Sequence, residues 1–342
     1  MRRTAGLVLV GAGAFLLVLT LMLKVYAEPR IVRAPLDQAT GTSSVSDGNS
    51  RVLDRGTLTV RTGLTLTARR EVRGLPKAAE ASGRDDIAVW ETGNTVLGPD
   101  KETISVTRET VAFDRRTGQA VVCCGDQVNG DTAVNHEGLF FKFPFETAKQ
   151  DYQFWDANAR KASTARFQGE ETRQGLTTYH FVHQVPETEL STVQVPPSLV
   201  GQTGDQLIPA TTVYTNTREL WVEPVSGIIV YGKETPKQVL RGEDGTELLT
   251  VFEANIGYTE QTEKERADEA RRSGGSVFLI RNVLPSITLV AGVLSLIGGL
   301  LLLFVLRGSR RRDDTPAVVD VRDRTTGAVP AVPADQDRPR ST

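Results

Sequence analysis

The sequence predicts a mainly β protein, in which a large antiparallel β-rich extracytoplasmic domain is flanked by an N-terminal and a C-terminal transmembrane helix. Three observations support this fold class. Two long apolar segments stand near the ends of the 342-residue chain. Between them the sequence repeats a strand, turn, strand pattern with Thr- and Val-rich arms. No helical segments alternate with these strands, which argues against a parallel sheet built from βαβ units.

The first apolar segment, residues 4–23, has no charged residue. As a helix it would cross roughly 30 Å, the thickness of the hydrocarbon core of a bilayer. Arg2 and Arg3 precede it, which predicts a cytoplasmic N-terminus. We therefore expect a transmembrane helix over residues 1–25. Residues 25–27 also offer a small-residue pattern for signal peptidase, so a cleaved signal peptide is the alternative, although the apolar stretch exceeds the roughly 7–15 residues of a usual signal core.

The second apolar segment, residues 283–306, is also uncharged and long enough to span a bilayer. An arginine cluster that begins at Arg307 follows it and predicts that the C-terminus is cytoplasmic as well. The final segment, residues 307–342, is rich in Pro, Asp and Arg without apolar periodicity, so we expect a disordered cytoplasmic tail. With both termini inside the cell, residues 26–280 would form an extracytoplasmic domain.

This domain reads as a chain of β-hairpins, because turn residues separate arms of apolar and β-branched residues. The expected turns lie at residues 93–94, 114–118, 174–175, 224–227 and 244–245. The last part of the domain, residues 260–280, begins with the charged run EQTEKERADEARR, which consists of good helix formers. We expect a helical stalk there that leads to the second span.

Charge and motifs exclude several classes of function. The formal net charge is −2, and acidic residues outnumber basic ones over residues 26–280, so the domain has no expected nucleic-acid-binding surface. The histidines are His136, His180 and His183, and the spacing of the last two places them on opposite faces of a strand, where they cannot chelate one metal. The sequence lacks recognisable catalytic and phosphate-binding motifs. We therefore predict that the protein is not an enzyme and has no catalytic residues, no metal and no cofactor.

Cys123 and Cys124 are the two cysteines of the chain, and they are adjacent. Oxidising surroundings outside the cytoplasm favour a disulfide, so we expect a vicinal bridge that fixes a tight turn before Gly125 at the end of a strand. Neighbouring Cα atoms are about 3.8 Å apart, below the usual disulfide range of roughly 4.4–6.8 Å, so such a bridge is unusual. Two buried thiols and an intermolecular bridge are the alternatives.

Aromatic residues make up 6% of the chain but are concentrated in residues 136–156. One interpretation is a packed core, in which Phe141, Phe143 and Phe145 alternate into the interior of a sheet. The other is the wall of an apolar cavity or a surface in contact with lipid. The core is favoured, and both interpretations hold if the core is hollow. The candidates for a cavity or lipid contact are Phe140, Phe141, Phe143, Phe145, Tyr152, Phe154 and Trp155.

Three short motifs carry a resemblance to a known family. They are K-F-P-F-x-T at residues 142–147, Y-x-x-W-D at residues 152–156, and L-W-V-E-P-x-S-G at residues 220–227. With the two spans and the basic tail, they make the chain similar to actinobacterial membrane proteins of the porin PorA family, a domain of unknown function. That family is likened at fold level to CD36-type receptors, which have two spans and a β-rich ectodomain with a lipid tunnel. No binding residue can be transferred from it.

The resemblance implies a membrane-anchored cell-envelope protein that binds or transfers a lipid or lipid-linked glycan through its ectodomain. Its expected partners are the lipid bilayer and a lipid or lipoglycan ligand. One alternative is a structural or assembly partner of other envelope proteins without a ligand of its own. The other is a porin-like channel formed after oligomerisation, which is less favoured because pores are lined by polar rings or carbonyls, whereas both predicted spans are uncharged.

Overall fold

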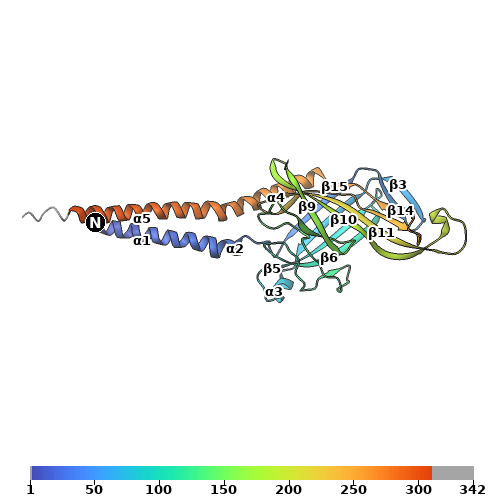
Figure 1. Cartoon of the computed structure of the whole chain (residues 1–342), viewed down its shortest axis with the longest axis horizontal. Helices are drawn as coiled ribbons and strands as arrows, with labels where there is room; N and C mark the ends of the chain where they lie inside the picture. Colours follow the sequence, from blue (N-terminus) through green and yellow to red (C-terminus); the bar gives the residue numbers. More distant parts are fainter. Residues whose placement is uncertain (1, 310–342) are drawn as a thin grey trace, which may run out of the picture. The chain divides into compact units, whose positions relative to one another are not determined.

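The computed structural model of the chain describes residues 2–309, with side chains from Arg3 to Phe304. Nearly all of the predicted tail, residues 307–342, lies outside the described residues. The described residues divide into two compact units, one formed by residues 2–15 and 292–309 and the other by residues 16–291. The first unit holds the ends of two long helices that are nearest the chain termini, and the second holds the β domain (Figure 1).

The β domain is a single sheet, which has fifteen strands in the described part of the chain. These are β1 (Ala39–Ser46), β2 (Ser50–Asp54), β3 (Thr59–Leu64), β4 (Thr67–Gly74), β5 (Ile87–Leu97), β6 (Thr103–Asp114), β7 (Gln127–Val128), β8 (Tyr152–Asp156), β9 (Lys161–Arg173), β10 (Leu176–Val195), β11 (Ile208–Glu223), β12 (Ile228–Glu234), β13 (Lys237–Arg241), β14 (Glu247–Glu253) and β15 (Ile256–Tyr258). Hydrogen-bonded neighbours follow the order β3-β2-β14-β13-β11-β12-β15-β1-β4-β5-β6-β7, and β10, β9 and β8 branch from β11. The pairs are antiparallel, which confirms the predicted fold class.

Three predicted hairpins are confirmed. A turn at residues 174–175 joins β9 to β10, the turn at 224–227 joins β11 to β12, and the turn around 244–245 joins β13 to β14. In each case a residue that accepts a positive φ angle occupies the turn, such as Gly227 (φ 71°) and Gly245 (φ 83°).

Two local predictions are wrong. A turn at Gly93-Asn94 is absent, because β5 continues without interruption through it. Gly93 pairs with Glu71 of β4 on one side and with Arg108 of β6 on the other, and hydrogen bonding along both edges keeps this segment extended despite its turn-forming residues. The arm expected after the turn at 114–118 is not a strand either, since residues 119–125 make only isolated bridges.

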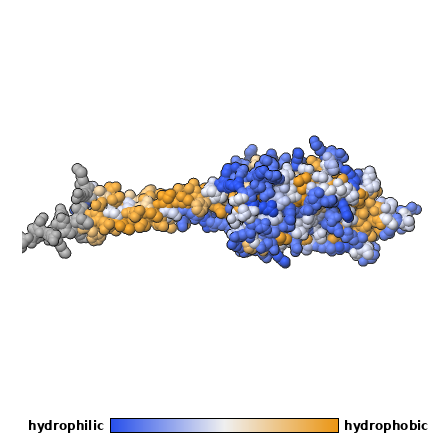
Figure 2. Space-filling view, turned by 90° about the horizontal axis from the view of Figure 1, so that it is seen from above, coloured by the Kyte–Doolittle hydropathy of each residue, from blue (hydrophilic) through white to orange (hydrophobic). Residues whose placement is uncertain are grey.

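Two helical stretches, Arg3–Ile31 and Glu260–Phe304, are long and apolar enough to cross a membrane. The helical segments of the described residues are α1 (Arg2–Met22), the π-helical turn η1 (Leu23–Ala27), α2 (Glu28–Ile31), α3 (Pro76–Ala81), the 3₁₀ turn η2 (Pro197–Val200), α4 (Glu260–Phe278), the π-helical turn η3 (Leu279–Val283) and α5 (Leu284–Ser309). In Figure 2 the surface along the long helices is hydrophobic (orange), and that of the β domain is mostly hydrophilic (blue).

Helix α4 covers the predicted stalk but is part of the domain. The side chain of Thr259 accepts a hydrogen bond from the backbone N–H of Thr262 and so caps the helix. Ala267 and Ala270 are fully buried and pack against β12. Their small side chains let α4 lie close to the sheet.

Small residues bring α1 and α5 together. Within the first unit, a Cβ atom added to Gly13 would lie 2.8 Å from the backbone nitrogen of Leu296. The Oγ atom of Ser295 donates a hydrogen bond to the carbonyl oxygen of Leu9 (2.8 Å). Close backbone approach at small residues and hydrogen bonds between helices are common in membrane-embedded helix pairs.

Replacement of Gly13 by leucine is expected to separate these helices, because the new side chain would collide with the backbone of α5. Gly11 is the matched control, since nothing lies within 4 Å of a Cβ atom added there. Cysteines introduced at Thr20 and Thr288, whose Oγ1 atoms are 2.7 Å apart, report the contact by disulfide cross-linking in membranes. Cross-linking should persist with Gly11→Leu and be largely lost with Gly13→Leu; equal yields in the two variants would contradict the pairing.

Candidate functional site

A cavity of about 380 Å³ lies between the sheet and helix α4. Its volume and mainly apolar walls are typical of a small-molecule site, for which roughly 300–1,000 Å³ is usual. Apolar side chains of the wall include Val72, Trp90, Phe141, Phe145, Ile228, Ile229 and Tyr258. Helix α4 contributes polar residues, namely Arg266, Glu269, Arg272, Ser273 and Ser276.

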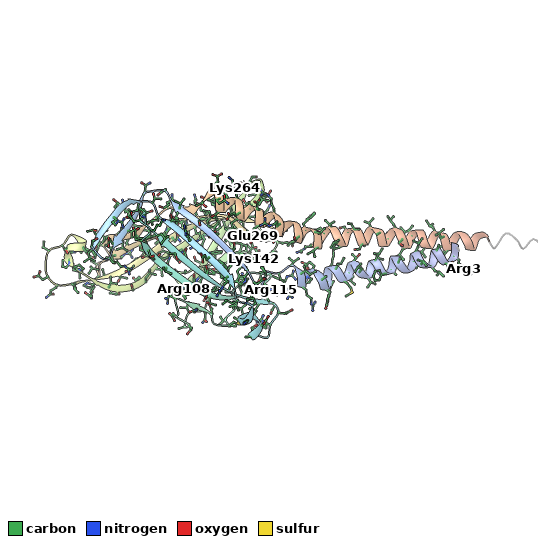
Figure 3. All side chains as sticks on the ribbon, turned by 180° about the vertical axis from the view of Figure 1, so that it is seen from behind. Arg3, Arg108, Arg115, Lys142, Lys264 and Glu269 are labelled. Atoms are coloured by element: carbon green, nitrogen blue, oxygen red, sulfur yellow. A yellow bond between two sulfur atoms is a disulfide. The ribbon has the colours of Figure 1, made fainter. Side chains whose placement is uncertain are left out.

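The cavity is at the end of the β domain where the helical segments join it. Its lining includes Ala34 and Pro35, which follow α2 in the chain, and Ser276, which stands just before η3. Figure 3 shows Lys142 and Glu269 at this end of the sheet. The segments that lead toward both candidate spans therefore also form part of the cavity.

Ion pairs hold this junction together. The carboxylate of Glu28 in α2 lies 3.3 Å from Arg116 and 3.4 Å from Arg281 of η3. Arg281 also lies 2.7 Å from Glu146, the residue after Phe145 of the cavity wall. Because Glu28 is buried, its pairing with two arginines fixes α2 and η3 against the segment that carries the wall.

That segment, residues 139–147, has no regular secondary structure and is held by the turn between β11 and β12. The backbone N–H of Phe143 donates to the carbonyl oxygen of Gly227 (2.9 Å), and that of Thr147 donates to Pro224 (2.8 Å). The first and third motifs of the sequence, residues 142–147 and 220–227, thus pack on each other. This contact places Lys142 and Phe145 at the cavity.

The seven aromatic candidates divide between cavity and core. Phe141 and Phe145 line the cavity. The prediction that they alternate with Phe143 on one strand is wrong, because the segment is irregular and Phe143 turns into the core, where it stacks on Phe181. The remaining candidates are buried in hydrophobic clusters, namely Phe140, Tyr152, Phe154 and Trp155.

Two cationic side chains at the cavity carry nitrogen atoms without a partner. The Nη2 atom of Arg70, from β4, and the Nζ atom of Lys142 are shielded from solvent and make no hydrogen bond to any described residue. The ammonium group of Lys142 lies 3.2 Å from the centroid of the Phe145 ring, a cation–π contact. Burial lowers the pKa of Lys142 to about 7, and the nearby carboxylate of Glu223 only partly offsets this. Unpartnered buried nitrogens are uncommon in native proteins and call for an explanation.

A second polar group, around His136, is missed by sequence reasoning. Its Nε2 atom lies 3.0 Å from the carboxylate of Glu109, and its Nδ1 atom contacts Asp126. The indole N–H of Trp155 also donates to Glu109 (3.0 Å). Burial alone would lower the pKa of His136, but the hydrogen bonds with the two carboxylates outweigh it and raise the pKa to about 8. His136 is therefore a charged link in the core.

The raised pKa predicts a pH dependence of stability. His136 is protonated in the folded protein up to about pH 8 but only to about pH 6.5 when unfolded. Its contribution is therefore complete below pH 6.5 and is lost as the pH rises through 8, which amounts to about 2 kcal/mol. The lowered pKa of Lys142 has the opposite effect on stability. Burial of its charged form destabilises the fold, and this cost falls as the pH rises above 7 and the amine loses its proton.

The difference in free energy of unfolding between wild type and His136→Gln isolates the histidine, because Lys142 is common to both. We expect this difference to shrink by about 2 kcal/mol between pH 6 and pH 9, measured by chemical denaturation of the full chain. A difference that does not change with pH would show that His136 is neutral in the fold.

A third buried group centres on Arg218 of β11. Its Nη2 atom lies 3.1 Å from Asp156, which has no exposed side-chain surface, and 3.0 Å from Glu234. Asp156 also accepts a hydrogen bond from the hydroxyl of Tyr214 (3.1 Å). Burial lowers the pKa of the neighbouring His183 to about 3, so its ring stays neutral beside Arg218. These contacts link Asp156, which belongs to the second motif and ends β8, to Arg218 and Tyr214 of β11.

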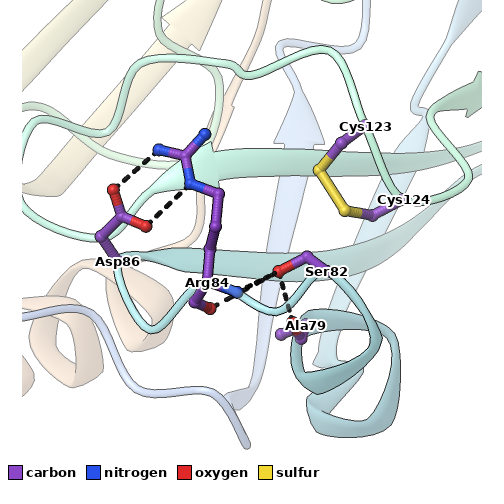
Figure 4. The surroundings of a disulfide bond; sticks show 6 residues. All are labelled: Ala79, Ser82, Arg84, Asp86, Cys123 and Cys124. Carbon is purple, nitrogen blue, oxygen red and sulfur yellow. Dashed lines mark hydrogen bonds and ion pairs between the residues drawn. A yellow bond between two sulfur atoms is a disulfide. The ribbon is translucent and has the colours of Figure 1, made fainter.

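Cys123 and Cys124 are bonded to each other in the structure, in the loop after β6 (Figure 4). Both pack at the edge of the cluster formed by Ala79 of α3 with Ile87 and other residues of β5 and β6. Cys124 has a positive φ angle of 64°. Neither cysteine lines the cavity.

Among the residues that the structure describes, no group of three or more His, Cys, Asp or Glu side chains is arranged to hold a metal ion. His180 stacks on Trp221 with ring centroids 4.4 Å apart and pairs with Glu219, whereas His183 lies in the Arg218 group. The two histidines do not share a site.

Comparison with known proteins gives the family. The family model described as Porin PorA matches residues 5–301. A protein named Porin PorA from Corynebacterium amycolatum is 26% identical over 297 residues, which cover 68% of this chain and 77% of the relative. Another, from Corynebacterium resistens (strain DSM 45100 / JCM 12819 / GTC 2026 / SICGH 158), is 24% identical over 323 residues, 68% of this chain and 76% of the relative. Two candidate spans and this match make the chain a membrane protein, and it belongs to the Porin PorA family.

Proposed function

We propose that the β domain binds a lipid or a lipid-linked glycan in its cavity, while α1 and α5 anchor it in the membrane of the cell envelope. The apolar cavity at the helix-bearing end of the domain is the observation that carries this proposal. Because α2 continues from α1 through η1, and η3 joins α4 to α5, a ligand in the cavity is held close to the bilayer. An acyl chain can then move between bilayer and cavity with little exposure to water.

A cavity-filling substitution tests the proposal. Ser273 of α4 lines the cavity, so Ser273→Trp should occupy part of it. Gly275 is the matched control, because it is exposed on the same helix and nothing lies within 4 Å of a Cβ atom added there. We expect lipid to co-purify with the full-length wild type and with Gly275→Trp. The amount should fall at least about fivefold with Ser273→Trp, because a loss of about 1 kcal/mol or more of binding free energy lowers the affinity by that factor.

The quantity to measure is lipid per chain, by mass spectrometry of solvent extracts after detergent exchange. Wild-type protein without bound lipid would overturn the proposal and favour a structural or assembly partner without a ligand. Equal lipid on the two tryptophan variants would show that the lipid binds the spans rather than the cavity.

A porin-like channel is the second candidate, favoured by the name of both relatives. A pore would require several copies of the chain, because one copy supplies two candidate spans, and hydrogen bonds between these spans already engage some of their polar side chains. Thr20 and Thr288 are hydrogen-bonded to each other, and Ser295 donates to a backbone oxygen of α1. Reproducible conductance steps from purified full-length protein in planar bilayers would establish the channel, and their absence would remove it.

We further propose that both termini are cytoplasmic and that the β domain is extracytoplasmic, as the arginines that precede the first span and follow the second one predict. A cysteine at Gly169 of β9 should react with a membrane-impermeant thiol reagent in whole cells. Protection of that cysteine until the cells are lysed would reverse the orientation.

A further inference from the structure

We propose that the cavity selects an amphiphile with an acidic headgroup, whose negatively charged oxygen atoms bind Lys142 and Arg70 while its apolar chain lies along the aromatic wall. This inference rests on the proposed function and names the class of ligand. Lys142 and Arg70 come from distant parts of the chain and line the same cavity, and each carries one of the solvent-shielded nitrogen atoms without a hydrogen-bond partner described above.

The charges around the cavity are unbalanced. Its lining contains four cationic residues and one acidic residue, Glu269. Glu269 already pairs with Arg266 within α4. Among the described residues, Arg70, Lys142 and Arg272 make no ion pair, so the cavity presents an excess of positive charge to a ligand.

An anion suits these atoms better than a neutral polar group does. A buried cationic nitrogen without a hydrogen-bond partner is costly. The ammonium of Lys142 has none, whereas the guanidinium of Arg70 donates through Nε to Thr92 and leaves Nη2 unpaired. An arginine side chain does not lose its proton in proteins. Carboxylate or phosphate oxygens would form charge-assisted hydrogen bonds with both groups, about twice as strong as neutral ones. The cationic side chains beside Trp90, Phe141 and Phe145 thus match a molecule with an anionic end and an apolar chain.

The test compares three probes with the same 16-carbon chain on full-length protein in detergent: palmitate, hexadecyl phosphate and the neutral hexadecanol. Native mass spectrometry counts the molecules retained per chain. We expect one palmitate or one hexadecyl phosphate per chain, at a probe concentration about tenfold below that needed for hexadecanol, since a charge-assisted hydrogen bond contributes roughly that factor or more. The comparison of palmitate with hexadecyl phosphate distinguishes a carboxylate from a phosphate headgroup.

Lys142→Met and Arg70→Met should each abolish the preference for the anionic probes while hexadecanol still binds. Lys149→Met is the matched control, because Lys149 is exposed, pairs with Glu170 and does not line the cavity. In the absence of ligand, Lys142→Met should unfold at the same or a higher temperature than wild type, since it removes an unpaired buried charge.

The outcomes separate the inference from the proposed function. Equal binding of all three probes to wild type, unchanged by Lys142→Met, would overturn the headgroup preference but keep the amphiphile site. Failure of every probe to bind would remove both. Binding of inorganic phosphate with the same affinity as hexadecyl phosphate would show an anion site without an amphiphile. A marked loss of thermal stability in Lys142→Met would assign Lys142 a structural role instead.

Discussion

Replacement of Gly227 by alanine is expected to lower the free energy of unfolding by about 3–5 kcal/mol. Gly227 has a φ angle of 71°, and a Cβ atom there would lie 2.1 Å from the carbonyl oxygen of Phe143 and 2.5 Å from that of Pro144. Both the left-handed backbone and the collision oppose the substitution. The collision falls on the segment that carries Lys142 and Phe145, so the cavity wall should be displaced as well.

Gly245→Ala separates the two causes. Gly245 also has a positive φ angle, of 83°, but nothing lies within 4 Å of a Cβ atom added there, so only the backbone cost of about 1 kcal/mol applies. Denaturant unfolding followed by tryptophan fluorescence measures both variants. Equal losses of stability would show that the contact between the third motif and residues 143–144 is not tight.

Arg218→Met should destabilise the domain by about 3–5 kcal/mol, because it leaves the fully buried carboxylate of Asp156 without its cation. Arg241→Met is the control. The pair of Arg241 with Glu187 is partly exposed to solvent, and such pairs contribute less than about 1 kcal/mol.

The double variant Arg218→Met with Asp156→Asn identifies the mechanism. If the loss arises from an uncompensated buried charge, neutralising Asp156 should recover part of it, although the amide nitrogen that replaces Oδ2 no longer accepts the hydrogen bond from the hydroxyl of Tyr214. A double variant that is as unstable as the sum of the single variants would indicate that Arg218 acts through packing alone.

The fold class and the two apolar spans follow from local patterns, and for this reason they can be predicted. The alternation of Thr and Val with turn residues identifies the hairpins whose turns lie at residues 174–175, 224–227 and 244–245. It misplaces a turn at Gly93, because pairing with Glu71 and Arg108 on both edges of β5 is a property of the assembled sheet. Similarly, Ala267 and Ala270 give α4 an apolar face that the surrounding charges conceal in the sequence.

The candidate site could be predicted only in part. The aromatic concentration includes Phe141 and Phe145, which line the cavity, but the sequence has no signal that separates them from Phe143, since the segment follows no regular period. Arg70 and Lys142 meet at one cavity because β4 and an irregular segment converge beneath α4. Their lack of partners is visible only in three dimensions. Lys142 does belong to the first motif, and Gly227 to the third, so two of the motifs mark the contact that builds the wall.

Photocrosslinking at Phe145 in living cells tests the central claim most directly, because it probes the cavity in the native membrane. A benzophenone amino acid replaces Phe145, with Leu294 of α5 as the position expected to meet bilayer lipid and Leu190 of β10 as the exposed position away from the cavity. We predict lipid adducts on the peptides containing positions 145 and 294 and none on that containing position 190. A lipid adduct at position 294 without one at position 145 would contradict a lipid-binding cavity.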